Sequence, residues 1–364
     1  MDFHPMDYDL FHCFARRRVN AARRIDGLPT GHRLGGVHGH TFHITAMTAL
    51  TGQGPAGLEQ KLALCVAPLD FGFLPDHIDH PTDEHIAGWI QTRLNTGSAV
   101  PHVGVRSAPD WNTTLAPGGR LVVCHVFEFD ASHWLPGVPD DHQCARLHGH
   151  HFSVAINVDA SASSADTMAL YSRIEAAWRP LQKELENNCL NDIPGLENPT
   201  SEIISRWIFS RLKGQLPGLA YINVCETRNA GCKFDGETFS IWKDQRFESA
   251  IPNPAASTPN QVTGRGYQLR IVLQSPLEET LGWVYDFGDV RRAFEPYMQQ
   301  LDHRYLEQFV PGENDGCLEL AKWLMNELST PLPKLQRIEL FESPFAGVIL
   351  SKPGAQPRLA YPMI

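Results

Sequence analysis

The chain has 364 residues, of which 42% are hydrophobic and 20% charged, and its formal net charge at pH 7 is -10. This composition is typical of an ordinary globular protein long enough for two or three domains with proper cores. The negative charge argues against a general nucleic-acid binder, and the eight scattered cysteines do not form a disulfide framework.

The opening residues show no basic segment followed by an apolar core, and no apolar run is long enough to cross a bilayer. Reduced cysteines also fit the cytosol. We therefore expect a cytoplasmic protein with no nucleic-acid partner and no membrane partner.

Three segments of the chain follow the same order of elements. The first has a strand-like run at Val37–Ile44, then a helix start near Pro81–Glu84. The same order recurs from about residue 122, and again from Lys243–Glu248 to Ile338–Glu342. A repeat near one third of the chain is too long for a solenoid unit, so each copy predicts a small ββααββ domain. The predicted domains are 1–117, 118–237 and 238–364.

The middle repeat carries a histidine pattern that is typical of a metal site. His148 and His150 are two residues apart, so in a strand they point to the same face. The strand-like run Val122–Asp130 leads into a third histidine, His133, on what we expect to be a neighbouring strand. Three imidazoles with an open fourth position indicate a catalytic zinc site, whereas Cys144 as fourth ligand would make the site structural or inhibited.

These residues resemble the 6-pyruvoyltetrahydropterin synthase / 6-carboxytetrahydropterin synthase family. The resemblance covers about residues 122–234 and includes the three histidines, Cys144, the run Asn191–Thr200 and the triplet Cys225–Thr227. Three residues between the cysteine and the first paired histidine are similar to the bacterial carboxy branch, because the pyruvoyl branch typically has a longer gap.

The resemblance implies the T-fold, in which three subunits each add a four-stranded sheet to a twelve-stranded barrel with helices outside. Three tandem repeats in one chain would then build an α+β pseudo-trimer alone. Two chains stacked end to end would make a homodimer of pseudo-trimers, by analogy with the family's hexamers.

Family members also carry an Asp-His pair that completes a catalytic triad with the cysteine of an adjacent subunit. The middle repeat has lost this pair at Leu185–Leu190, whereas the third repeat keeps Asp302 and His303. The third repeat has no zinc set, since Ile251 stands at the first-ligand position. In the first repeat, Arg23 stands there, although the pair His38 and His40 is retained.

These complementary losses predict one composite active site between repeats 2 and 3. The middle repeat would supply zinc through its three histidines together with Cys144, and the third would supply Asp302 and His303. The competing interpretation is an inactive protein in which three copies have decayed independently.

A glutamate on the late strand of a repeat can accept two hydrogen bonds from a pterin ring. Glu226 and Glu342 both lie at that position, while the first repeat has Ser107. Glu226 together with Thr200 is the favoured substrate-binding set. Thr200 is equally well explained as a helix N-cap.

The resemblance implies a zinc-dependent lyase of 7,8-dihydroneopterin triphosphate, a small-molecule pterin triphosphate. The product would be 6-carboxy-5,6,7,8-tetrahydropterin, a precursor of 7-deazapurines such as queuosine, or 6-pyruvoyltetrahydropterin if no carbon–carbon bond breaks. A non-catalytic pterin- or purine-binding module remains open. Zinc-dependent hydrolysis of a cyclic amide is a further possibility, but it gives Asp302 and His303 no role.

Overall fold

A computed structural model describes residues 10–28, 34–50, 54–95, 100–161, 167–253, 261–278, 281–308, 310 and 316–353. The first nine residues, on which the expectation of no leader segment depends, lie outside these ranges. No helix in the described ranges is both long enough and apolar enough to cross a membrane.

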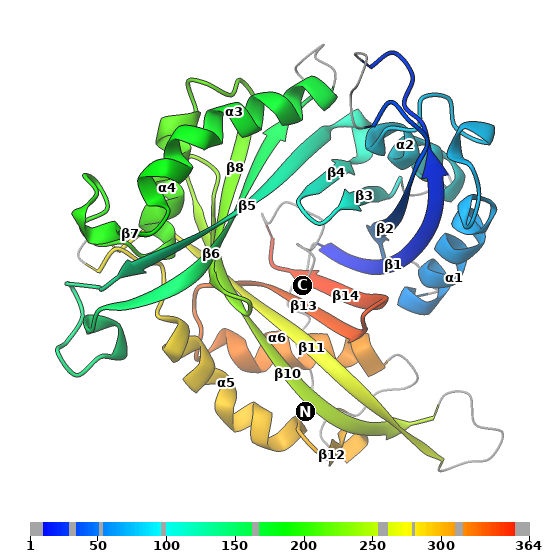
Figure 1. Ribbon diagram of the computed structural model, residues 1–364. Coiled ribbons are helices and arrows are strands. Elements are labelled where there is room, and N and C mark those ends of the chain that lie inside the picture. The colour runs from blue at the N-terminus through cyan, green and yellow to red at the C-terminus, as the bar shows by residue number, and fades with distance from the viewer. Residues whose placement is uncertain are drawn as a thin grey trace.

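Twelve long strands form the frame of the molecule, four from each repeat (Figure 1). The first repeat contributes β1 (Leu10–Arg23), β2 (His38–Ala49), β3 (His102–Ala108) and β4 (Trp111–Leu115). The second contributes β5 (Leu121–His133), β6 (His148–Asp159), β8 (Leu219–Thr227) and β9 (Ala230–Phe234). The third contributes β10 (Phe239–Pro252), β11 (Val262–Ser275), β13 (Leu335–Ser343) and β14 (Ala346–Ser351).

Each long strand pairs antiparallel with both neighbours, and the ring closes on itself. Strand β4 pairs with β5, β9 with β10, and β14 with β1, so every seam between repeats is a strand pair. Two short strands, β7 (Asn188–Cys189) and β12 (Arg304–Tyr305), join β5 and β10 in parallel at the rim. The twelve-stranded barrel predicted from the repeats is confirmed.

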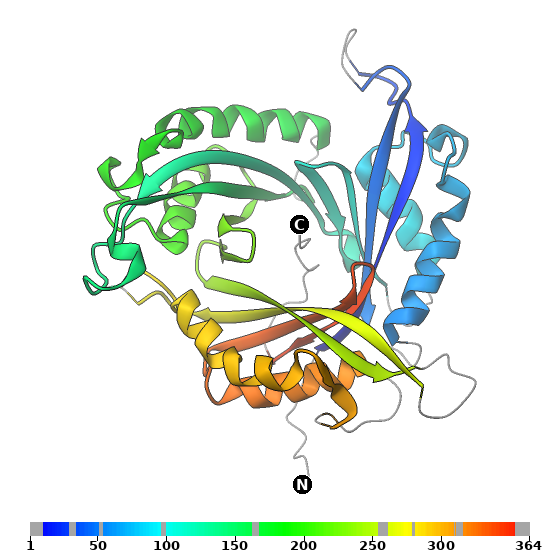
Figure 2. The same cartoon turned by 60° about the horizontal axis from the view of Figure 1, so that its bottom comes forward.

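In the part of the chain that the structure describes, six α-helices lie on the outside of the barrel, two per repeat (Figure 2). They are α1 (Gly54–Val66), α2 (Asp83–Leu94), α3 (Thr167–Leu185), α4 (Ser201–Leu212), α5 (Phe287–Leu301) and α6 (Gly316–Ser329). Alternate strand residues are apolar and pack under these helices. The other residues of each strand face the barrel interior.

The same tight turn follows the first helix of each repeat. Phe71, Asn187 and His303 have φ values of 56°, 58° and 56°, in the left-handed region. In each copy the acidic residue just before this position accepts a hydrogen bond from a backbone N–H of the repeat's first strand. The pairs of acceptor and donor are Asp70 with Asn20, Glu186 with Asp130, and Asp302 with Glu248. The predicted correspondence of the three Asp-His stretches is therefore also a structural one.

Candidate active site

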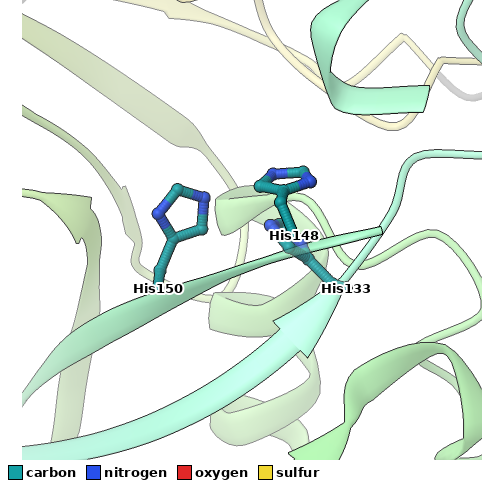
Figure 3. Close-up of side chains that lie close together, drawn as sticks. All are labelled: His133, His148 and His150. Atoms are coloured by element: carbon teal, nitrogen blue, oxygen red, sulfur yellow. The ribbon is translucent and has the colours of Figure 1, made fainter. Parts of the chain in front are cut away.

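Three imidazoles converge at the rim end of β5 and β6. His148 and His150 point from one strand, and His133 comes from the strand beside it (Figure 3). The backbone pairing places His133 directly opposite His148. One nitrogen from each ring lies within 4.8 Å of the others. This arrangement is the facial set of ligands that the sequence predicts.

Hydrogen bonds orient two of the rings toward a shared centre. His133 Nδ1 lies 3.0 Å from the carbonyl oxygen of Pro199, and His148 Nδ1 lies 2.7 Å from that of Arg146. The tautomers with Nδ1 protonated leave Nε2 as an acceptor. His133 Nε2 is buried without a hydrogen-bond partner among the described residues. A divalent metal would satisfy that atom, and ring N–H bonds of this kind are typical around zinc.

The electrostatics of the cluster favour neutral imidazole, the form that binds metal. Burial lowers the pKa of His133 to about 4. Burial also lowers the pKa of His150, against the opposing effect of Glu226. His133 and His150 therefore fit a zinc ion without first losing a proton at neutral pH.

Cys144 lies in the loop between β5 and β6, within a short 3-10 turn at Gln143–Ala145. The loop is held at the cysteine itself, because its carbonyl accepts a 2.8 Å bond from the N–H of Leu135 and its own N–H donates to His142. Burial, with Glu226 and Asp286, raises the pKa of the thiol. Burial and the two neighbouring carboxylates therefore favour the protonated thiol in this chain.

His148, His150 and Cys144 line one pocket of about 420 Å³ at the seam between repeats 2 and 3. Repeat 3 contributes Lys243 and the segment from Trp283 to the first turn of α5. A pocket therefore lies at the predicted seam, with two basic side chains, Arg146 and Lys243, on its wall.

Two buried carboxylic acids form the inner wall of this pocket. Burial raises the pKa of Glu226, and it raises the pKa of Glu202 to about 8. Glu202 Oε1 accepts a 2.8 Å hydrogen bond from the N–H of Val284, across the seam. No sequence pattern assigns Glu202 to the pocket, so its place there is a finding of the structure.

Thr200 is the N-cap of α4, since its hydroxyl accepts from the N–H of Ile203 at 3.2 Å. The same hydroxyl donates a 2.6 Å bond to the carbonyl of Gly282 in repeat 3. Its single donor is therefore used, and one lone pair remains toward the pocket. The predicted capping role of Thr200 is confirmed.

The structure does not bring Asp302 and His303 to this pocket within one chain. They follow the last residue of α5, whereas the first residues of that helix line the pocket. At 1.5 Å per residue, the fifteen-residue helix separates its two ends by about 20 Å. His303 Nδ1 is 2.9 Å from Asp302 Oδ2, and the His303 side chain is 81% exposed.

Among the described residues of the other two repeats there is no equivalent metal set. Arg23 lies directly opposite His38, in the register of His133 and His148, and its guanidinium forms a 2.7 Å ion pair with Asp83. In the third repeat, the corresponding opposed residues are Ile251 and Thr263. Glu342 also lies in the third repeat and does not line the seam pocket.

Several residues of this pocket are not predicted from the sequence. The most important of them are His142 and Asp286. His142 stands two residues before Cys144, and Asp286 is the N-cap of α5. The two residues lie far apart in the sequence and meet only where repeats 2 and 3 pack together. No local sequence pattern could therefore have paired them. The sequence signal available for Asp286 was the run Trp283–Gly288, which resembles the corresponding segment of family members.

Comparison with known proteins gives a consistent assignment. The family model described as 6-pyruvoyl tetrahydropterin synthase matches twice, over residues 123–237 and 240–353. The chain is 35% identical over 120 residues to the 6-carboxy-5,6,7,8-tetrahydropterin synthase of Synechocystis, covering 31% of this chain and 92% of that protein. It is 32% identical over 90 residues to the dihydroneopterin monophosphate aldolase of Pyrococcus furiosus, covering 25% of this chain and 73% of that protein.

Among solved structures, the 6-pyruvoyl tetrahydropterin synthase of Caenorhabditis elegans aligns at 15% identity with a TM-score of 0.28. That alignment covers 30% of this chain and 94% of the other. The chain belongs to the 6-pyruvoyl tetrahydropterin synthase family, through two matched repeats. It is an enzyme of the lyase type that this family defines.

Proposed function

We propose that the chain is a zinc-dependent lyase of the 6-carboxy-5,6,7,8-tetrahydropterin synthase type, acting on 7,8-dihydroneopterin triphosphate. The observation that carries the proposal is the three-imidazole cluster in one pocket with Cys144 and two buried carboxyl groups. The similarity to the Synechocystis synthase supports this substrate class and product.

His133, His148 and His150 would hold the zinc ion, because their free ring nitrogens converge and burial keeps His133 and His150 neutral. When bound, zinc supplies Lewis acidity toward side-chain oxygens of the substrate. The carbonyl groups of Pro199 and Arg146 fix the ring orientations of His133 and His148.

The pterin ring would bind against the inner wall of the pocket. Glu226 accepts from the 2-amino group and ring N–H of the pterin, and the remaining lone pair of Thr200 accepts a further donor. Trp283 and Tyr285 offer aromatic faces for the ring. Arg146 and Lys243 are the basic pocket residues available to the triphosphate.

Cys144 would move a proton at a side-chain carbon of the substrate. Burial opposes the thiolate, so the thiolate needs positive charge in the loaded pocket. Proton transfers of this kind support a redox-neutral tautomerisation with loss of triphosphate. In the carboxy branch, carbon–carbon cleavage also releases acetaldehyde.

We further propose that Asp302 and His303 serve the Cys144 of a second chain, in a homodimer of pseudo-trimers. Within one chain α5 holds this pair about 20 Å from the pocket end of the same helix. Both side chains are open to solvent at the rim, and Asp302 orients the ring of His303. The composite site would then join repeat 2 of one chain to repeat 3 of its partner.

The test is zinc analysis and mass spectrometry of the products formed from 7,8-dihydroneopterin triphosphate. One zinc per chain with 6-carboxytetrahydropterin and acetaldehyde supports the proposal. Formation of 6-pyruvoyltetrahydropterin instead assigns the pyruvoyl activity. Bound zinc and bound pterin without turnover would replace the lyase with a non-catalytic binding module.

A further inference from the structure

Four basic side chains gather on one face of the sheet in repeat 1, away from the seam pocket. Arg18 on β1 lies directly opposite His43 on β2, and His43 lies directly opposite Arg106 on β3. Arg16 is two residues before Arg18, so it lies on the same face. A row of basic groups therefore crosses three adjacent strands.

This face is turned to the inside of the barrel. The residues between the basic ones, such as Val19, Ile44 and Val105, belong to the core under α1 and α2. Because side chains alternate along a strand, the basic residues point the opposite way, toward the barrel axis. The strands β1, β2 and β3 lie side by side in Figure 1.

The groups are close enough to oppose one another's charge. Burial, followed by the charges of Arg106 and Arg18, lowers the pKa of Arg16 to about 10. Burial likewise lowers the pKa of His43 to about 4, with contributions from all three arginines. His43 is therefore uncharged at neutral pH, and the repulsion within the row is among the three arginines.

Several other arginines of the molecule have a carboxylate beside them. Arg17, on the opposite face of β1, lies 3.0 Å from Glu59. Inside the barrel, two arginines of repeat 3 are paired at 2.7 Å and 2.9 Å: Arg270 with Asp244, and Arg337 with Glu339. Within the described ranges, neither Arg16 nor Arg18 forms such an ion pair.

The basic row belongs to repeat 1 alone. The matching positions across repeat 2 are Glu128, Ser153 and Cys225. Across repeat 3 they are Arg246, Gln268 and Phe341. The fold therefore does not require the basic row. The row occurs in repeat 1, where Arg23 stands at the position of the metal-site residue His133.

We propose that the barrel interior at repeat 1 binds a small anion with phosphate groups through Arg16, Arg18 and Arg106. Guanidinium groups match phosphate oxygens in pairs, and several converging cations favour a multiply charged ligand. A bound anion would offset the repulsion within the row. The inference depends on neither zinc nor the proposed lyase reaction.

The experiment is calorimetric titration of the full chain with inorganic tripolyphosphate at low ionic strength. We expect Arg16→Gln/Arg18→Gln to weaken binding at least about tenfold. The matched control is Arg246→Gln, which changes the residue of repeat 3 that corresponds to Arg18 and should bind like wild type. Arg18→Gln alone, at an exposed position, should show part of the loss.

Thermal melting provides a control for folding. Without the anion, the double variant should melt at or above the wild-type temperature, because repulsion is removed, and tripolyphosphate should raise the melting temperature of wild type alone. Absence of binding to wild type, or equal binding to the double variant, overturns the proposal. So does loss of binding in Lys243→Gln, which would locate the anion in the Cys144 pocket. Tighter binding of a single-stranded oligonucleotide through the same arginines overturns the small-anion assignment.

Discussion

His142 Nε2 lies 3.2 Å from Asp286 Oδ2, and this contact joins repeat 2 to repeat 3 beside Cys144. The other ring nitrogen, Nδ1, accepts the backbone N–H of Cys144 at 3.2 Å. A neutral ring that accepts at Nδ1 carries its proton on Nε2 and donates it to Asp286. Asp286 in turn accepts backbone N–H groups at the start of α5. The cysteine loop is thus anchored to the first turn of a helix in the next repeat.

Replacing His142 should therefore impair turnover without removing the metal. We expect His142→Ala to lower kcat by roughly ten- to a hundredfold, since a misplaced reacting group costs about that much. KM and zinc content should change little. His151→Ala is a suitable control, because His151 pairs with Glu128 and Asp130 rather than with pocket residues. Loss of zinc in His142→Ala would instead show that His142 supports the metal ligands.

The first repeat offers a test of what excludes a second metal. Arg23 is buried at 2% exposure, and Nε2 of both His38 and His40 has no hydrogen-bond partner among the described residues. The guanidinium occupies the ligand position and supplies positive charge where a metal would bind. Replacing it together with Asp83 avoids leaving a buried carboxylate without its cation.

We accordingly expect wild type to hold one zinc per chain and Arg23→His/Asp83→Ser to hold two, by elemental analysis after dialysis. The substitutions copy the residues at the matching positions of repeat 2, His133 and Ser201. His148→Ala in the same background should return the count to one. A count of one in the double variant would mean that backbone geometry, rather than Arg23, excludes the metal.

The repeats and the histidine cluster follow from local sequence patterns, whereas the barrel was implied by the resemblance to a family that builds it from three subunits. Strand alternation places His148 and His150 on one face, and the repeat order gives each copy four strands. The residues that repeat 3 places beside Cys144 cannot be predicted from such local patterns. Asp302 and His303 were expected beside Cys144, but the direction of α5 puts Asp286 there instead. Only the packing of two repeats determines which end of a helix faces the neighbouring pocket.

Glu202 should make stability depend on pH in the direction typical of a buried acid. Burial raises its pKa to about 8 in the folded chain, above the value near 4.5 of an exposed glutamate. Between these values the folded state holds a proton that the unfolded state has lost, so stability falls as pH rises.

Glu202→Gln keeps an oxygen for the N–H of Val284 and cannot ionise. Compared with wild type, we expect this variant to gain roughly 3.5 kcal/mol of unfolding free energy between pH 5 and pH 8, measured by urea denaturation. Glu197→Gln provides a control at an exposed carboxylate. Equal pH slopes for wild type and Glu202→Gln would show that Glu202 stays ionised in the folded chain.

Mixing two inactive variants tests whether the active site is shared between chains. Cys144→Ala and His303→Ala should each be inactive alone, because each removes one side of every composite site. If His303 serves the cysteine of a partner chain, a mixed dimer contains one site with both residues intact. Random reassembly of equal amounts makes half of the dimers mixed, so roughly a quarter of the wild-type activity should return. No recovery in a mixture shown by mass spectrometry to contain mixed dimers would place both residues in sites of one chain, and full activity of His303→Ala alone would remove His303 from the reaction.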